Sequence, residues 1–231
     1  RKVILRTNTP VTRIRAVAAG AYAWEVDTES TTTSANAVIM ATPAGVTGSL
    51  TAMIDEALSK LQTVRTAATA MITFEFASAS LQLPQHGTGV LVPLRTEWTG
   101  RDSLLTTAIT FLDRKWTNLQ RPESTVLRIH VGRSDDQRYA KYSDDELSER
   151  ILKELAYILG EAPTPLRTIV SRWTAGLPQY AVGHERLVSE ARAVSEPLNL
   201  FLAGNSYDGV GIPASINSGR LTARQVLRAI S

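Results

Sequence analysis

A glycine-rich run near the C-terminus carries the residues best suited to hold a ligand. It reads Leu200-Phe201-Leu202-Ala203-Gly204-Asn205-Ser206-Tyr207-Asp208-Gly209-Val210-Gly211-Ile212-Pro213. The pattern predicts a strand, a loop and the N-terminus of a helix. Glycine lets backbone N–H groups approach a ligand closely, and free donors at a helix start favour negative charge. The run therefore predicts a site for a phosphate or an electron-rich ring edge, with a purely structural turn as the alternative.

No second group of residues forms a recognisable acid/base or metal site. The chain has no cysteine, which excludes disulfides, thiolate metal sites and a cysteine nucleophile. The three histidines (His86, His130 and His184) are scattered, so we expect no bound metal. The carboxylates of residues 144–146 are explained by a capping box that begins at Ser143. The catalytic residues are therefore unknown at this point.

The charge pattern limits the classes of molecule that we expect the chain to bind. A net charge of +3 over 231 residues is too small for a dedicated nucleic-acid binder, so we expect no nucleic acid. Only five of the 25 basic residues are lysine. Arginine suits bidentate contact with carboxylates and phosphates, although a general genomic preference for arginine explains the bias equally well. Without a long apolar run or a secretory signal, we expect a cytoplasmic protein, with peripheral membrane contact as an open option.

Short strands and separate helices are predicted along the chain. Alternating or continuous apolar residues predict strands at 3–5, 11–14, 21–26, 37–40, 70–76, 89–92, 104–112, 126–131, 166–173 and 198–202. Helical spacing predicts helices near 54–61, from Ser143 to Gly160, at 185–195 and at 213–230. We expect the last helix to point five residues inward: Ile216, Ala223, Val226, Leu227 and Ile230. This arrangement is typical of an α+β fold with a mixed or antiparallel sheet.

The glycine-rich run, followed by Ile216, Ser218-Gly219 and Ala223, closely resembles the C-terminal FAD motif of the protoporphyrinogen/coproporphyrinogen oxidases. These enzymes belong to the monoamine-oxidase-like flavoprotein superfamily. Three further stretches resemble family motifs in the same order along the chain. They are Ala37–Ala44, ending in A-T-P-A; Asp113-Arg114-Lys115-Trp116; and the R-W…L-P-Q-Y-x2-G-H run from Arg172 to His184. The similarity covers essentially the whole chain and favours the bacterial enzymes that act on coproporphyrinogen.

The resemblance implies a domain organisation. Residues 1–45 and 195–231 are expected to be pieces of a split FAD-binding domain, and residues 46–194 an α+β substrate-binding domain. The family's G-x-G-x-x-G unit, which holds the FAD pyrophosphate, has no counterpart near the start of this sequence. We therefore expect the chain to be the C-terminal half of the enzyme, partnered by an N-terminal half and inactive alone.

The resemblance also implies roles for individual residues. FAD would contact Val11 near the adenine, Trp173 near the isoalloxazine, and Gly204 and Asn205 along the ribityl and phosphate chain. Gly211, Ile212 and Pro213, at the helix start, would stabilise negative charge on the reduced flavin. Lys115 would attract a substrate propionate. Arg95, Arg101 and Arg128 are further candidates for propionate contact, with nothing in the sequence to order them.

Each role has a structural alternative. Trp173 at a strand end is also typical of a core residue, Val11 of an ordinary strand residue, and Lys115 of a solvated surface cation. The activity implied is oxidation of coproporphyrinogen III or protoporphyrinogen IX in haem biosynthesis, by hydride transfer to flavin and reoxidation by oxygen. The alternatives are another flavin amine oxidase or desaturase, or a non-catalytic binding module.

Overall fold

The computed structural model describes residues 3–17, 23–99, 102–161 and 163–231. They form two compact units, and the chain crosses between them twice. The first unit contains the residues up to 65 together with residues 178–231, and the second contains residues 66–177. Helices and antiparallel strands occur together in both units, which confirms the predicted α+β class. None of the helices in the described ranges is long and apolar enough to cross a membrane.

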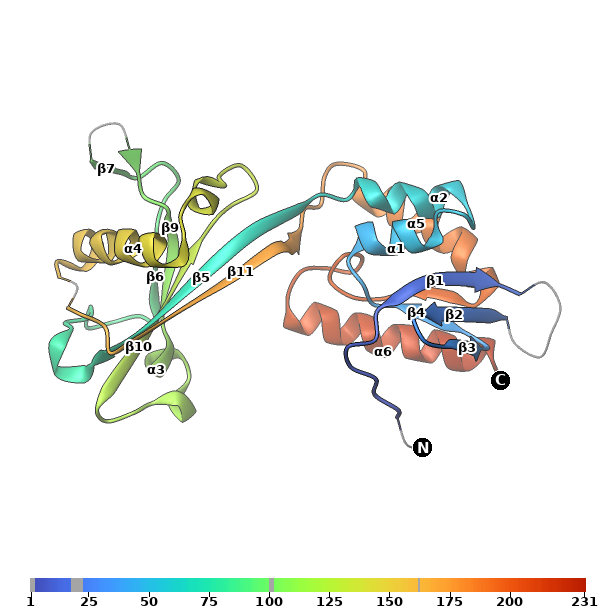
Figure 1. The fold of residues 1–231 in the computed structure, drawn as a ribbon, viewed down its shortest axis with the longest axis horizontal. Helices are drawn as coiled ribbons and strands as arrows, with labels where there is room; N and C mark the ends of the chain where they lie inside the picture. Colours follow the sequence, from blue (N-terminus) through green and yellow to red (C-terminus); the bar gives the residue numbers. More distant parts are fainter. Residues whose placement is uncertain (1–2, 18–22, 100–101, 162) are drawn as a thin grey trace. The chain divides into compact units, whose positions relative to one another are not determined.

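The second unit is built on a five-stranded sheet of order β11-β5-β10-β9-β6 (Figure 1). Its strands are β5 (Thr66–Ala77), β6 (Gly89–Leu91), β9 (Thr106–Phe111), β10 (Ser124–Val131) and β11 (Arg167–Pro178). A small ribbon pairs β7 (Glu97–Thr99) with β8 (Asp102–Ser103), and the short helix α3 (Leu112–Lys115) follows β9 directly. These strands confirm the predictions at 70–76, 89–92, 104–112, 126–131 and 166–173.

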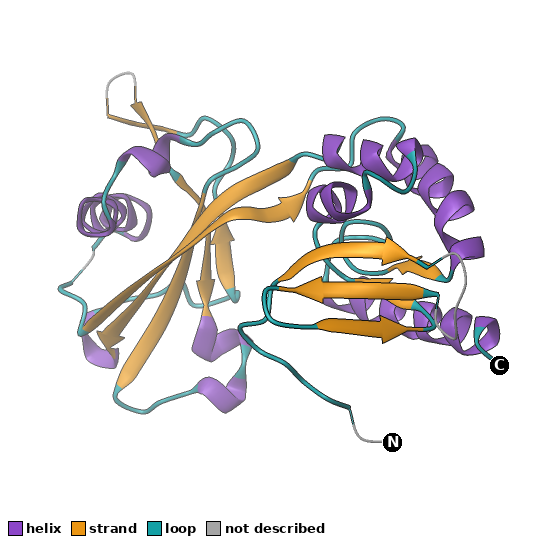
Figure 2. Cartoon of the chain, turned by 45° about the vertical axis from the view of Figure 1, so that its right-hand side comes forward, coloured by secondary structure: helices purple, strands orange, loops and turns teal. Residues whose placement is uncertain are grey.

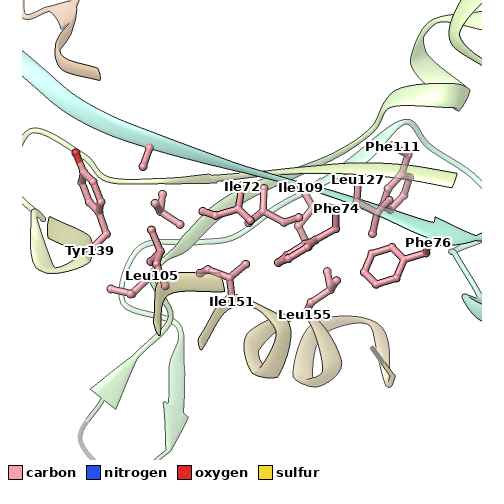
Figure 3. Packing of buried hydrophobic residues seen from close by; sticks show 14 of the residues in the cluster. Ile72, Phe74, Phe76, Leu105, Ile109, Phe111, Leu127, Tyr139, Ile151 and Leu155 are labelled. Carbon is pink, nitrogen blue, oxygen red and sulfur yellow. The ribbon is translucent and has the colours of Figure 1, made fainter. Parts of the chain in front are cut away.

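Helix α4 (Asp144–Leu159) packs on one face of this sheet. In Figure 3, Ile151 and Leu155 of α4 point toward Ile72, Phe74 and Ile109 of the strands. Only alternate residues of each strand face α4, since successive side chains of a strand point to opposite faces. The capping box at Ser143 and the left-handed Gly160 bound the helix as predicted.

The first unit combines two small sheets with helices (Figure 2). An antiparallel meander holds β1 (Val11–Ala16), β2 (Trp24–Thr28) and β3 (Thr32–Ala35), and β4 (Val38–Met40) pairs in parallel with β12 (Leu200–Leu202). The helices are α1 (Ala44–Thr51), α2 (Glu56–Ser59), α5 (His184–Ser195) and α6 (Ile212–Ala229). The buried Trp24 anchors the core and donates its indole N–H to the carbonyl of Leu198, at 2.8 Å.

Several predicted elements in the first unit were wrong. Residues 3–5 form no strand and are exposed, because none of the strands in the described ranges pairs with them. Residues 32–35, for which no strand was predicted, form β3, since these threonine-rich residues pair with β2. Helix α1 was not predicted. Residues 21 and 22 of the strand predicted at 21–26 lie outside the described residues.

The inward face of α6 also differs from the prediction. Ile216, Ala223, Leu227 and Ile230 are exposed and Val226 is half-buried, whereas Ser218 and Thr222 are buried. The hydroxyl groups explain this choice. Ser218 accepts from the N–H of Gly204 at 2.8 Å, and Thr222 donates to the carbonyl of Leu202 at 3.4 Å. Helix α6 is therefore held to β12 by hydrogen bonds rather than by an apolar stripe.

The boundaries of the compact units differ from the domain boundaries expected at 45/46 and 194/195. Residues 46–65 pack into the core of the first unit through Leu58 and Leu61, and α5 joins the same core through Val188 and Ala191. The chain therefore divides at 65/66 and 177/178.

Candidate functional site

The loop from β12 to α6 has a backbone that requires glycine. Gly204, Gly209 and Gly211 have φ angles of 111°, 117° and 125°, a region that side-chain-bearing residues rarely adopt. A Cβ at Gly204 or Gly211 would meet no atom within 4 Å, so packing is not what selects glycine there. The loop thus presents backbone with open space beside it, which fits the close approach of a ligand.

A polar network holds this loop in place. Asp208 accepts from the guanidinium of Arg192 on α5 at 2.7 Å and from the hydroxyl of Ser218 on α6. The same hydroxyl receives the Gly204 N–H. One carboxylate thereby fixes both ends of the loop, and Arg192 balances its charge.

The predicted A-T-P-A stretch lies against the same loop. The N–H of Ala44 donates to the Ser206 hydroxyl at 3.2 Å, and the N–H of Ala203 donates to the carbonyl of Met40 at 3.0 Å. The Tyr207 hydroxyl lies 2.7 Å from the hydroxyl of Thr47, and burial raises its pKa to about 12. The phenol therefore stays protonated at neutral pH and acts here as a structural group.

Tyr180, from the predicted P-Q-Y-x2-G-H run, closes the loop from the other side. Its hydroxyl donates to the carbonyl of Asn205 at 2.6 Å and accepts from the N–H of Gly209 at 2.9 Å. Its ring stacks on His184, with centroids 3.9 Å apart. His184 is buried at the first position of α5. Tyr180 therefore bridges two backbone positions of the loop.

Replacing Tyr180 by phenylalanine is expected to loosen this loop without disturbing the ring stack. The change removes two hydrogen bonds, each contributing about 0.5–1.5 kcal/mol. Hydrogen exchange at Gly209 should become faster, and the midpoint of thermal unfolding should fall slightly. Tyr157→Phe is the control, because Tyr157 is exposed on α4. Equal exchange at Gly209 in both variants would contradict the bridging role.

The start of α6 is the part of the loop with free donors. Gly211 precedes the helix, Ile212 is its first residue, and Pro213 lies in the first turn, where its missing N–H costs nothing. Ile212 and Ala214 have no carbonyl one turn earlier in the helix to bond, and Ile212 is largely exposed. The positive end of the helix dipole therefore faces open space.

The structure brings together five of the predicted cofactor residues, Gly204, Asn205, Gly211, Ile212 and Pro213, in this one loop and helix start. Val11 begins β1 in the same unit, at an irregularity in the pairing with β2. Trp173 lies in β11 of the second unit and is 44% exposed, which excludes the alternative of a core tryptophan within that unit. Its neighbour Arg172 has a structural role, pairing with Asp144 of α4 at 2.8 Å.

Lys115 ends α3 in the second unit and is exposed. Its positive charge acts on the imidazole of His130 on β10. Burial, then Arg128 and then Lys115 lower the pKa of His130 below its usual value. Three basic side chains therefore lie near one another on this unit, whereas Arg95 lines a different cavity and Arg101 lies outside the described residues.

The lowered pKa of His130 predicts a loss of stability in mild acid. The unfolded imidazole takes up its proton near pH 6.5, above the folded one, so the free energy of unfolding should fall as pH drops through 6.5. In urea unfolding between pH 7.5 and 5.5, His130→Gln should make the free energy of unfolding depend less on pH. Since His86 and His184 are present in both proteins, the difference between the two curves reports on His130. Parallel curves for the two proteins would refute this origin.

Sequence reasoning had not assigned Tyr180, Arg192, Asp208 or Ser218 individual roles. Tyr180, Asp208 and Ser218 lie within the motifs themselves. Polar residues placed between glycines or near Pro178 were the signal that could have indicated them. Arg192 carries no such signal. Its position on α5 is visible only once the chain is folded.

Comparisons with known proteins agree with these motifs. The sequence pattern of the family described as flavin containing amine oxidoreductase matches residues 1–227. The chain is 27% identical over 208 residues to coproporphyrinogen III oxidase of Bacillus subtilis, covering 89% of this chain and 43% of that protein. It is 32% identical to coproporphyrinogen III oxidase of Mycobacterium bovis over 201 residues, covering 85% and 41%.

A solved structure shows the same fold. An Exiguobacterium sp. 255-15 protein, assigned as a protoporphyrinogen oxidase, superposes with a TM-score of 0.79 at 29% identity, over 96% of this chain and 46% of that chain. The chain thus spans less than half the length of the relatives it matches. The resemblance to the porphyrinogen oxidases is confirmed by these findings. This chain belongs to the flavin-containing amine oxidoreductase family.

Proposed function

We propose that the chain forms part of an FAD-dependent oxidase that aromatises a porphyrinogen, coproporphyrinogen III or protoporphyrinogen IX. The observation that carries the proposal is the glycine-rich loop leading into α6, whose three positive-φ glycines and free helix-start donors fit a flavin. The names of the relatives support the substrate class.

In this proposal, the first unit holds part of the FAD and the second unit binds substrate. Gly204 and Asn205 contact the ribityl and phosphate chain, and Val11 approaches the adenine. Gly211, Ile212 and Pro213 stabilise negative charge through the helix dipole. Trp173 contacts the isoalloxazine. Bound FAD would supply the redox chemistry, accepting hydride from a methylene bridge of the substrate and passing the electrons to oxygen.

The residues of this chain would orient the flavin and the substrate and exclude water, rather than transfer protons. The Asp208 carboxylate is engaged by Arg192 and Ser218, and the Tyr207 phenol is held protonated by burial. Neither is free to act as a base. An N-terminal half holding the FAD pyrophosphate, a cytoplasmic location and peripheral membrane contact stay predictions.

The proposal is tested by anaerobic reduction of the flavin-loaded whole enzyme, in which this chain is joined to the N-terminal half proposed above. We expect coproporphyrinogen III or protoporphyrinogen IX to bleach the flavin absorbance within the time of one turnover, and admission of oxygen to restore it. A simple primary amine serves as the alternative substrate of the same family. Bleaching by the amine with none by either porphyrinogen, or a whole enzyme that binds no flavin, would overturn the proposal.

A further inference from the structure

The sheet of the second unit has a second face, opposite the one on α4. Residues of β5 and β10 that alternate with the buried core point there, among them Thr73, Glu75, Val126 and Arg128. A cavity of about 340 Å³ lies on this face. Its walls come from β5, β10, β11 and the segment after α3.

The lining of this cavity has an excess of positive charge. Arg121, Arg128 and Arg167 line it together with one carboxylate, Glu75. Glu75 is already engaged, accepting from the Ser124 hydroxyl at 2.7 Å and pairing with Arg121 at 3.2 Å. Bonding to Ser124 and the charges of Arg121 and Arg167 lower its pKa, so it is ionised at neutral pH. One carboxylate thus faces three guanidinium groups.

Arg128 is the cation of this cavity that has a buried donor left unsatisfied. Its Nε atom is buried and has no hydrogen-bond partner among the described residues, and no ion pair joins it to Glu75 or to another carboxylate there. A buried donor without an acceptor is costly, and such groups are rare unless a ligand or water completes them. The guanidinium fork is suited to receive a carboxylate through two parallel hydrogen bonds.

We propose that this cavity binds a carboxylate arm of the substrate, with Arg128 as the principal contact and Arg167 as the second. The inference rests on the proposed function, since porphyrinogens carry propionate arms. Sites for whole drug-sized ligands range from about 300 to 1,000 Å³. A cavity of about 340 Å³ lies at the bottom of that range, which suits one corner of a tetrapyrrole rather than the whole ring system.

The position of Lys115 supports this assignment. Lys115 and Arg128 both act on His130, so the positive field extends along β10 beyond the cavity. A substrate with several carboxylates could place a second arm there. Of the residues considered for propionate contact from sequence, Arg128 is the one that the structure sets in a cavity with an unpartnered buried nitrogen.

The test is substrate kinetics of the flavin-loaded whole enzyme, with both halves present, carrying Arg128→Gln, which keeps a polar side chain and removes the charge. The KM for coproporphyrinogen III should rise about 10- to 100-fold, as loss of one charge-assisted pair implies, while kcat changes little. Arg128→Lys should recover part of the loss. Lys153→Ala, which removes one exposed charge from α4, is the control and should leave KM unchanged.

A binding measurement keeps the inference falsifiable if a variant turns over poorly. Coproporphyrin III, followed by quenching of protein fluorescence, should bind Arg128→Gln and Arg167→Ala more weakly than the parent protein. Its tetramethyl ester, dispersed in detergent, should not distinguish them. Equal binding of the free acid by parent and Arg128→Gln, with normal porphyrinogen turnover, overturns the carboxylate site and leaves the proposed function standing. A parent protein that oxidises no porphyrinogen overturns both.

Discussion

Replacing Glu154 by alanine is expected to lower the free energy of unfolding of the second unit by about 3–5 kcal/mol, the range seen when one partner of a buried ion pair is removed. Glu154 is fully buried on α4. Its carboxylate accepts from the N–H groups of Leu105 and Thr106, at 3.0 and 2.9 Å, and from the Thr106 hydroxyl at 2.8 Å. Its charge is balanced by Arg150, with Nε at 3.0 Å.

The large effect follows from what the substitution leaves behind. Two backbone donors of the segment entering β9 would be buried without an acceptor, which costs about 1–3 kcal/mol each. Arg150 would keep Asp102, at 2.8 Å, and its contact with the Trp98 ring, whose centroid lies 4.5 Å away. The guanidinium is thus only partly compensated. The free energy of unfolding of Glu154→Gln should lie between those of the parent protein and Glu154→Ala, because one acceptor oxygen remains.

Urea unfolding followed by circular dichroism measures this effect, with amide exchange at Leu105 and Thr106 as the local readout. Glu149→Ala is the matched control. Glu149 is an exposed glutamate of the same helix, so its removal should change stability by no more than about 0.5 kcal/mol. If the two variants unfold at the same urea concentration, the carboxylate does not hold β9 to α4.

Glu154 also illustrates what a sequence can reveal and what it hides. The helical spacing of Leu147, Ile151 and Leu155 indicates the buried face of α4, and Glu154 lies on that same face. The helical spacing could therefore have marked it as inward. Its partners could not be foreseen, because Leu105 and Thr106 lie 49 and 48 residues away along the chain.

Helix α6 shows the opposite failure. Apolar periodicity selected Ile216 and Leu227 as inward, but Ser218 and Thr222 are the buried residues. Periodicity ranks side chains by hydrophobicity, and it assigns no value to a hydroxyl that satisfies a buried backbone group such as the Gly204 N–H. The loop itself was predictable, since glycine types and spacing determine where positive φ angles are allowed. The hydrogen bonds with which Tyr180 and Asp208 hold the loop depend on distances that exist only in the folded chain.

The second large effect is expected at Gly211, where alanine should reduce the flavin bound by the whole enzyme that contains this chain and its proposed N-terminal half. Gly211 has φ 125° and ψ 158°, a combination that is essentially restricted to glycine and costs other residues about 1–3 kcal/mol. A Cβ there would meet no atom within 4 Å, so the penalty comes from the backbone alone. The chain should relieve it by turning the first residues of α6 away from their present position.

Because the helix-start donors point where this glycine sets them, a small backbone rotation moves the groups at the start of α6 that are proposed to face the flavin. A strain of about 1.4 kcal/mol expressed in binding corresponds to a tenfold weaker flavin complex. Flavin per chain, and its dissociation constant by fluorescence titration, are the measurements. Gly219→Ala is the control within the same helix, since Gly219 also has free space for a Cβ but lies in the helix interior.

The two glycine variants separate flavin placement from general stability. Alanine is the better helix former, so Gly219→Ala should raise the unfolding temperature and leave flavin binding unchanged. Gly211→Ala should weaken flavin binding more than it lowers the unfolding temperature. Full flavin occupancy in Gly211→Ala would mean that the start of α6 does not face the cofactor. In that case the glycines of this loop serve only the turn between β12 and α6, which is the structural alternative that the sequence left open.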